Sequence, residues 1–166
     1  NDIVFEKGWA SAIVSVMNER SDIACFCPYD PGSEYQQSLF SPGIKYKTGY
    51  GIKYEFAGWC YLLKRNTMSL ISNFDERFSF YFQDDDFCMT LKKFNLKNAV
   101  VFDSVVRHLG HQTSTITEGY SYNQRIINDR NVYHAKWGSQ RSISLKNKLF
   151  KVLRSVGLGF MGKYLY

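Results

Sequence analysis

Proline is rare in this sequence, long apolar runs are missing, and no cysteine pair has the spacing of a metal or redox motif. With 3 prolines and 45% hydrophobic residues, the composition excludes a collagen-like or intrinsically disordered chain. No stretch reaches the roughly 18 consecutive apolar residues of a membrane-spanning helix, and no basic-then-apolar segment marks a secretion signal. The 166 residues therefore predict a soluble globular protein with one sizeable core.

The cysteines are Cys25, Cys27, Cys60 and Cys88, and the one close pair is spaced C-x-C rather than C-x-x-C. All of them lie in largely apolar sequence. We therefore expect buried free thiols in a reducing compartment, and hence a cytoplasmic protein.

The net charge of +6 is modest, but basic residues gather late in the chain. No acidic residue lies among Arg141, Lys146, Lys148, Lys151, Arg154 and Lys163. A nucleic-acid-binding protein would combine such charge with a recognised module. No such module is present, so we expect no nucleic-acid partner.

Alternating hydrophobic patterns divide most of the chain into short elements. Strands are expected at residues 3–5, 22–27, 56–63, 98–102 and 105–106, and helices at residues 7–17, 66–71 and 84–94. Residues 29–54 are rich in Gly, Pro, Ser, Tyr and Lys and predict a long connection, which is often functional or mobile. Strands that alternate with helices indicate an α/β layer fold.

Three consecutive carboxylates, Asp84, Asp85 and Asp86, begin the helix expected at residues 84–94. Acidic residues at this end of a helix complement its dipole, each by a few tenths to about 1 kcal/mol, and Asp84 has the position of a cap. A cap needs only one carboxylate, however, and three neighbours repel one another. The excess charge is therefore also a candidate for binding a cation or accepting a proton from a hydroxyl.

His108 ends a strand-like run and is followed by Leu109 and Gly110. Imidazole is a common metal ligand. By spacing alone, a packed or solvated histidine is the more common outcome at a strand end. Asp2, just before the first strand, indicates nothing by itself.

Several short motifs occur in a fixed order: NDIVF at residues 1–5 with Gly8-Trp9, FAGWC at 56–60, NFDERF at 73–78, YFQDDD at 81–86, His108, and KWG at 136–138. Each motif alone is weak. Together they resemble family-2 glycosyltransferases of the rhamnosyltransferase-like kind over residues 1–138. The resemblance implies part of a GT-A fold, with a mixed sheet flanked by helices, and places that fold's nucleotide-binding part ahead of residue 1.

The resemblance also implies an activity: transfer of a sugar from a nucleotide-diphospho-sugar to an acceptor hydroxyl, in polysaccharide or glycoconjugate synthesis. Asp84 matches the carboxylate that serves these enzymes as catalytic base. Gln83 precedes it, where the family often has Glu, so the base is kept and the charge of its neighbour differs. One base without a paired nucleophile suggests single displacement with inversion, by analogy with inverting glycosidases.

Asp2 matches the last carboxylate of the family's Asp-x-Asp motif, and His108 matches a further metal ligand. The implied cofactor is a divalent cation, Mn²⁺ or Mg²⁺, which neutralises charge on the departing diphosphate. We therefore expect Asp2 and His108 to lie close together in the fold. The implied substrate-binding residues are Gly58, Trp59, Asp85 and Asp86.

Two other functions remain open on the sequence. A glycan-binding module derived from a transferase would keep the aromatic and polar surface without turnover. A metal-dependent phosphotransfer or hydrolase domain would use the aspartate cluster, but no Gly-rich phosphate loop accompanies it.

The sequence further divides into residues 1–138, the carboxyl-terminal part of a catalytic domain, and a basic tail at residues 139–166. Apolar residues recur on one helical face of this tail, at Leu145, Leu149, Val152, Leu153 and Val156. Packing on the parent domain is the usual fate of such a stripe. The alternative is peripheral contact of residues 143–166 with the anionic inner face of a membrane, which suits a lipid-linked acceptor.

Overall fold

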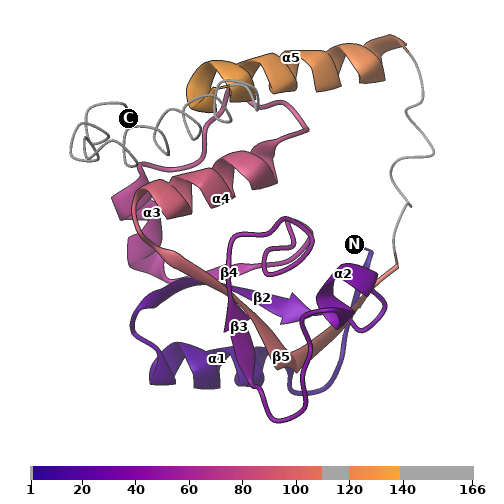
Figure 1. Ribbon diagram of the computed structural model, residues 1–166, viewed down its shortest axis with the longest axis vertical. Helices are drawn as coiled ribbons and strands as arrows, with labels where there is room; N and C mark the ends of the chain where they lie inside the picture. Colours follow the sequence, from indigo (N-terminus) through magenta and orange to yellow (C-terminus); the bar gives the residue numbers. More distant parts are fainter. Residues whose placement is uncertain (1, 110–119, 139–166) are drawn as a thin grey trace, which may run out of the picture.

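The computed structural model describes residues 2–109 and 120–138 (Figure 1). The strands are β1 (Ile3–Phe5), β2 (Ile23–Tyr29), β3 (Tyr46–Thr48), β4 (Leu62–Leu63) and β5 (Lys97–His108). The helices are α1 (Trp9–Glu19), α2 (Glu34–Gln37), α3 (Arg65–Ile71), α4 (Gln83–Lys93) and α5 (Tyr120–Trp137). This alternation confirms the predicted α/β class.

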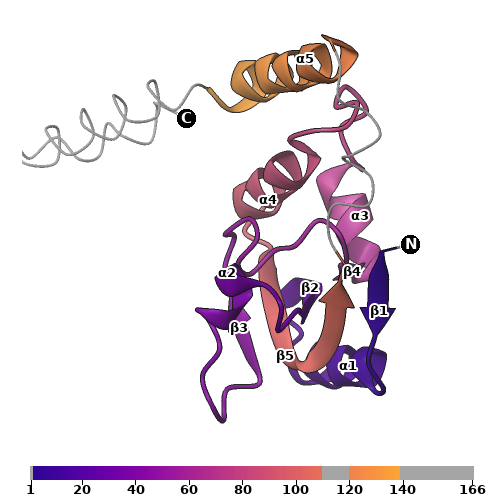
Figure 2. The ribbon, with the colours of Figure 1, turned by 90° about the vertical axis from the view of Figure 1, so that its right-hand side faces the viewer.

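Within the described residues, the strands form one mixed sheet in the order β1-β5-β2-β4, and β3 also pairs with β5. β2 and β5 are parallel, with Phe26 opposite Ala99, and the other pairs are antiparallel. The long strand β5 pairs with β3 near its start and with β1 near its end, and it curves between them (Figure 2). This curled sheet brings the beginning of the chain to the end of β5.

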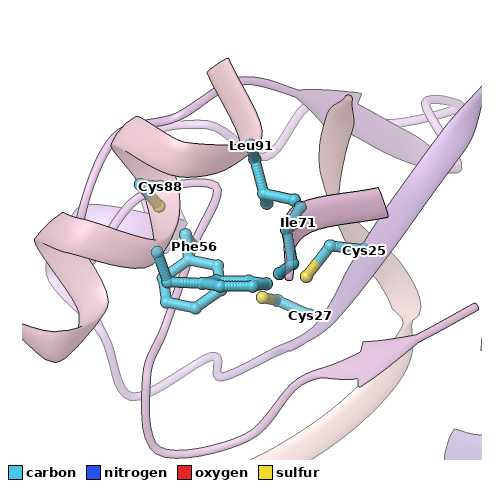
Figure 3. Packing of buried hydrophobic residues seen from close by; sticks show 7 residues of the cluster. Cys25, Cys27, Phe56, Ile71, Cys88 and Leu91 are labelled. Atoms are coloured by element: carbon cyan, nitrogen blue, oxygen red, sulfur yellow. The ribbon is translucent and has the colours of Figure 1, made fainter. Parts of the chain in front are cut away.

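Helices cover both faces of the sheet, and each face has its own apolar cluster. β2 is buried along its whole length, as expected for a parallel strand, and its successive side chains point to opposite faces. On the α1 side, Phe26 packs with Ile13 and Val16. On the side of α3 and α4, the cluster contains Cys25, Cys27, Phe56, Ile71, Phe87, Cys88 and Leu91 (Figure 3).

The cysteines are free thiols, as the sequence predicts. Cys25, Cys27 and Cys88 are buried, whereas Cys60 is partly exposed. Burial raises the pKa of the Cys25 and Cys88 thiols well above the ordinary value. These two cysteines therefore stay protonated and act as small apolar side chains of the core.

The helices predicted at residues 7–17 and 84–94 agree closely with α1 and α4, and the strand predicted at residues 22–27 agrees with β2. The strand predicted at residues 56–63 is wrong for most of its length, because only β4 is extended there. Residues 57–60 form a turn instead, in which Cys60 N–H donates to Ala57 C=O at 3.2 Å. The connection predicted at residues 29–54 contains α2 and β3.

α5 is an element that the sequence patterns do not predict. The amphipathic tail expected at residues 143–156 lies outside the described residues. Neither described range holds a helix that is long and apolar enough to span a bilayer.

Candidate functional site

Asp84 lies in the first turn of α4 and faces the turn that contains Gly58. The helix begins at Gln83, directly after Phe82, whose φ of 60° is in the left-handed region. A Cβ atom placed on Gly58 would lie 2.2 Å from Asp84 Oδ2, far inside van der Waals contact. The close approach of α4 to this turn therefore depends on glycine at position 58.

The carboxyl groups of Asp84 and Asp85 are both partly buried. Burial raises the pKa of Asp84, and the negative charge of Asp85 raises it further, against a smaller lowering by a backbone hydrogen bond. Burial also raises the pKa of Asp85. A carboxylate with a raised pKa is a stronger proton acceptor, which is the property that a general base requires.

Asp86 differs from its two neighbours because its side chain contacts α5. It is 5% exposed, Trp137 Nε1 donates to its Oδ1 at 2.7 Å, and Lys136 Nζ lies 2.8 Å from the same oxygen. Lys136 Nζ also donates to Asp75 Oδ2 at 2.8 Å. Asp86 therefore makes the α4–α5 contact, and it also belongs to the lining of the pocket beside Asp84, so its predicted part in substrate binding stays a prediction.

Asp2 and His108 meet at the edge of the sheet, as expected from the sequence. β1 pairs with the end of β5, so that Ile3 lies opposite His108, and Leu109 N–H donates to Asp2 C=O at 2.8 Å. Asp2 Oδ2 lies 3.2 Å from His108 Nε2. The indole ring of Trp59 stacks on the His108 imidazole, with ring centroids 5.2 Å apart and an interplanar angle of 9°.

The turn at residues 57–60 connects these two groups of residues. Gly58 touches the Asp84 carboxylate, and the next residue, Trp59, covers the ring of His108. Both side chains of the Asp2–His108 pair are partly exposed, at 23% and 26%. The structure therefore brings Asp2, Gly58, Trp59, Asp84 and His108 into one region.

The donor atoms of Asp2 and His108 fit a divalent cation only in part. A carboxylate oxygen and an imidazole nitrogen are suitable ligands for Mn²⁺, and the carboxylate suits Mg²⁺. Across the described residues, no group of three or more His, Cys, Asp or Glu side chains forms a metal cluster. A cation held here would need further oxygen ligands from water or from a substrate phosphate.

A pocket of about 340 Å³ opens beside Asp84, within the size range of small-molecule sites. Its aromatic lining consists of Phe56, Tyr61, Phe74, Phe78 and Phe87, and its polar lining includes Asp75, Glu76, Gln83 and Asp84. Phe56, Phe78 and Phe87 are buried, so the rings that a sugar could reach are those of Phe74, which is exposed, and Tyr61, which is partly exposed. Carboxylates accept hydrogen bonds from the hydroxyl groups of a sugar. This combination is suited to a carbohydrate.

Asp129 of α5 is a buried polar residue that the sequence patterns did not single out. It is 1% exposed, and its carboxylate accepts from the backbone N–H groups of Ser79, Phe80 and Tyr81 at 3.0, 2.9 and 2.7 Å. A lone aspartate within a largely polar helix carries no local signal that would have indicated this contact.

Comparisons with models of protein families, with curated proteins and with solved structures found no match for this chain. The functional assignment therefore depends on the geometry of the residues above and on the resemblance of the sequence motifs.

Proposed function

We propose that the protein is a glycosyltransferase of the GT-A type, which moves a sugar from a nucleotide-diphospho-sugar to an acceptor hydroxyl. One observation carries this proposal: the adjacent residues Gly58 and Trp59 contact Asp84 and His108, respectively. The turn at residues 57–60 thus links a proton acceptor to an Asp–His pair that suits a cation. The curled mixed sheet flanked by helices is compatible with such a fold.

In the proposed reaction, the acceptor sugar occupies the pocket beside Asp84. Asp84 accepts the proton of the acceptor hydroxyl while the hydroxyl oxygen forms a bond to the anomeric carbon of the donor. The bond between that carbon and the diphosphate oxygen breaks, and the nucleoside diphosphate leaves with the electron pair. Attack from the face opposite the leaving group inverts the anomeric configuration.

Asp2 and His108 are the residues that would hold Mn²⁺ or Mg²⁺ next to the leaving group. Such a cation, when bound, neutralises the negative charge that develops on the diphosphate. The Trp59 ring restricts the orientation of the His108 imidazole by stacking on it. Glycans and lipid-linked sugars are the acceptor classes that this proposal favours.

The test uses the natural full-length protein with a panel of uridine, guanosine and thymidine diphospho-sugars, Mn²⁺ and mixed glycan acceptors. Released nucleoside diphosphate is the readout. Asp84→Asn should lower turnover roughly 100-fold or more, because the amide cannot accept the proton, while donor binding stays nearly unchanged. Glu19→Gln, on the helix that covers the opposite face of the sheet, is the control. Near-normal turnover of Asp84→Asn removes this residue from the role of base.

The same assay separates the second candidate function, glycan binding without turnover. The pocket of aromatic rings and carboxylates fits a sugar whether or not a donor is present. Sugar binding without release of nucleoside diphosphate from any donor supports this alternative.

A further inference from the structure

Residues 79–86, which we call the base-bearing segment, lead from the pocket into the first turn of α4 and contain Asp84. α5 lies beyond α4 on the side away from the sheet, as both ribbon views show (Figures 1 and 2), and its last residues, Lys136 and Trp137, contact Asp86 of α4. The base-bearing segment therefore has α5 on one side and the pocket beside Asp84 on the other.

Asp129 makes the first contact between α5 and this segment. Its two carboxylate oxygens accept from three consecutive backbone N–H groups, those of Ser79, Phe80 and Tyr81, and also from the Ser79 hydroxyl. Burial raises the pKa of Asp129, but the backbone hydrogen bonds from Tyr81, Ser79 and Phe80 outweigh it, and the pKa ends below its ordinary value. Asp129 is therefore ionised at neutral pH and holds the backbone through charge-assisted hydrogen bonds.

α5 makes two further contacts with the base-bearing segment, at residues 82 and 86. The Tyr133 ring packs on the Phe82 ring with centroids 5.5 Å apart, and Lys136 and Trp137 bind the carboxylate of Asp86. The α5 residues in these contacts, at positions 129, 133, 136 and 137, have the i, i+4, i+7, i+8 spacing of one helical face. One polar and aromatic face of α5 thus holds the segment at successive points.

The backbone between these points is in a conformation that needs such support. Phe82 has a φ of 60°, which L-amino acids rarely adopt, and it directly follows the three residues bound to Asp129. This bend starts α4 and directs Asp84 toward Gly58, whereas Asp86 is directed toward α5. Residues in sparsely populated backbone regions persist where neighbouring contacts determine them.

We propose that α5 positions Asp84, with Asp129 as the main positioning residue: it fixes the bend at residues 79–82 and so holds the Asp84 carboxylate against Gly58 beside the pocket. The description of Asp84 as a base rests on the proposed function. The positioning itself is independent of it, because it concerns contacts within this chain.

The test compares Asp129→Asn with the unchanged protein by amide hydrogen exchange and by the NMR titration of the Asp84 carboxyl carbon. Asparagine keeps the shape of the side chain but offers one acceptor oxygen, and its NH₂ group faces backbone donors. Exchange at residues 79–86 should rise about tenfold or more, whereas amides of β2 and β5 should keep their protection. Looser packing admits water, so the pKa of Asp84 should fall toward its ordinary value.

The titration needs two controls. Asp85, Tyr61 and Cys88 interact electrostatically with Asp84, and their own signals must be followed in the same experiment. Asp22→Asn also removes a hydrogen-bonded carboxylate, but one that pairs with Arg20 and Lys97 next to β2. It should leave the Asp84 pKa and the exchange at residues 79–86 unchanged.

Ser79→Ala is a milder second variant in case Asp129→Asn does not fold. It removes the hydroxyl hydrogen bonds to Asp129, at 3.1 and 3.2 Å, and should shift both readouts in the same direction by a smaller amount. Unchanged exchange and an unchanged Asp84 titration in the variants that fold contradict the proposal. If these shifts occur while no donor is ever turned over, the positioning holds and the transferase assignment fails.

Discussion

The β2–β5 pair lies in the interior of the fold, whereas α5 lies at the surface and Asp129 is the buried residue among its described side chains, and different interactions hold the two regions together. β2 and β5 combine a parallel ladder with apolar side chains, among them Phe26, Val100 and Val101, that are fully buried. The α4–α5 contact depends on the carboxylates of Asp86 and Asp129 and on the donors that bind them.

This difference has consequences for how each region tolerates change. Removing side-chain volume from an apolar core lowers the free energy of unfolding by an amount that grows with the cavity left behind, and an apolar core contains no carboxylate whose protonation would alter it. A buried carboxylate that loses its partner keeps its desolvation cost without compensation. The sheet should therefore determine global stability, whereas the α4–α5 contact should determine the local geometry around Asp84.

The largest effect should come from the sheet. Phe26→Ala, at a position that is fully buried between β2 and α1, should lower the free energy of unfolding by about 4 kcal/mol. Urea denaturation followed by circular dichroism measures this loss. Phe94→Ala, at an exposed ring at the end of α4, is the matched control and should cost far less. A small effect of Phe26→Ala would mean that the sheet is not the main source of stability.

An intermediate effect should come from Gly58, where the turn meets α4. The added methyl group of Gly58→Ala would overlap the Asp84 carboxylate, so unfolding free energy should fall by about 2 kcal/mol and the carboxylate should be displaced. Chemical denaturation and the NMR titration of Asp84 measure the two consequences. The double variant with Asp84→Ala removes the obstacle and should recover most of the lost stability. Without recovery, Gly58 and Asp84 are not in the contact described.

The smallest effect on stability should come from acid, through protonation of Asp75, which binds Lys136 of α5. The hydrogen bond from Arg77, then that from Lys136, hold the pKa of Asp75 well below its ordinary value of 3.8, despite burial. A lowered pKa in the folded state stabilises the protein above pH 3.8, and this contribution is lost as the pH falls below that value.

After allowance for solvent screening, protonation of Asp75 should lower the free energy of unfolding by about 1 kcal/mol. Hydrogen exchange between pH 5 and pH 3, corrected for the intrinsic pH dependence, should show α5 losing protection before β5. Loss of protection in both elements at the same pH contradicts the division into two regions.

The same division explains what the sequence could predict. The apolar positions of α1, β2 and α4 repeat with helical or strand spacing, so local patterns located these elements. The approach of Asp2 to His108 followed from the resemblance of the motifs, because no local pattern relates two residues so far apart. The expected strand at residues 56–63 was wrong because an apolar run was read as extended, although Gly58 lets it turn against α4.

α5 was not predicted because its contact face consists of Asp129, Tyr133, Lys136 and Trp137. Polar and aromatic residues at this spacing resemble a solvated helix, and hydrophobic periodicity does not detect them. Their partners lie about 50 residues earlier in the chain, as the separation of Ser79 from Asp129 illustrates. A contact between distant polar groups has no counterpart in a local pattern.

The pairing of β1 with the end of β5 also sets the order in which the proposed site is assembled during synthesis. Asp2 and His108 are separated by 106 positions, so Asp2 leaves the ribosome long before its partner exists. At roughly 5–20 residues per second, the interval is on the order of 5–20 s. Contacts of such high sequence separation also form late in folding. A nascent chain therefore completes its α1–β2 unit well before it gains the Asp–His pair, and the proposed cation site can form only when β5 is in place.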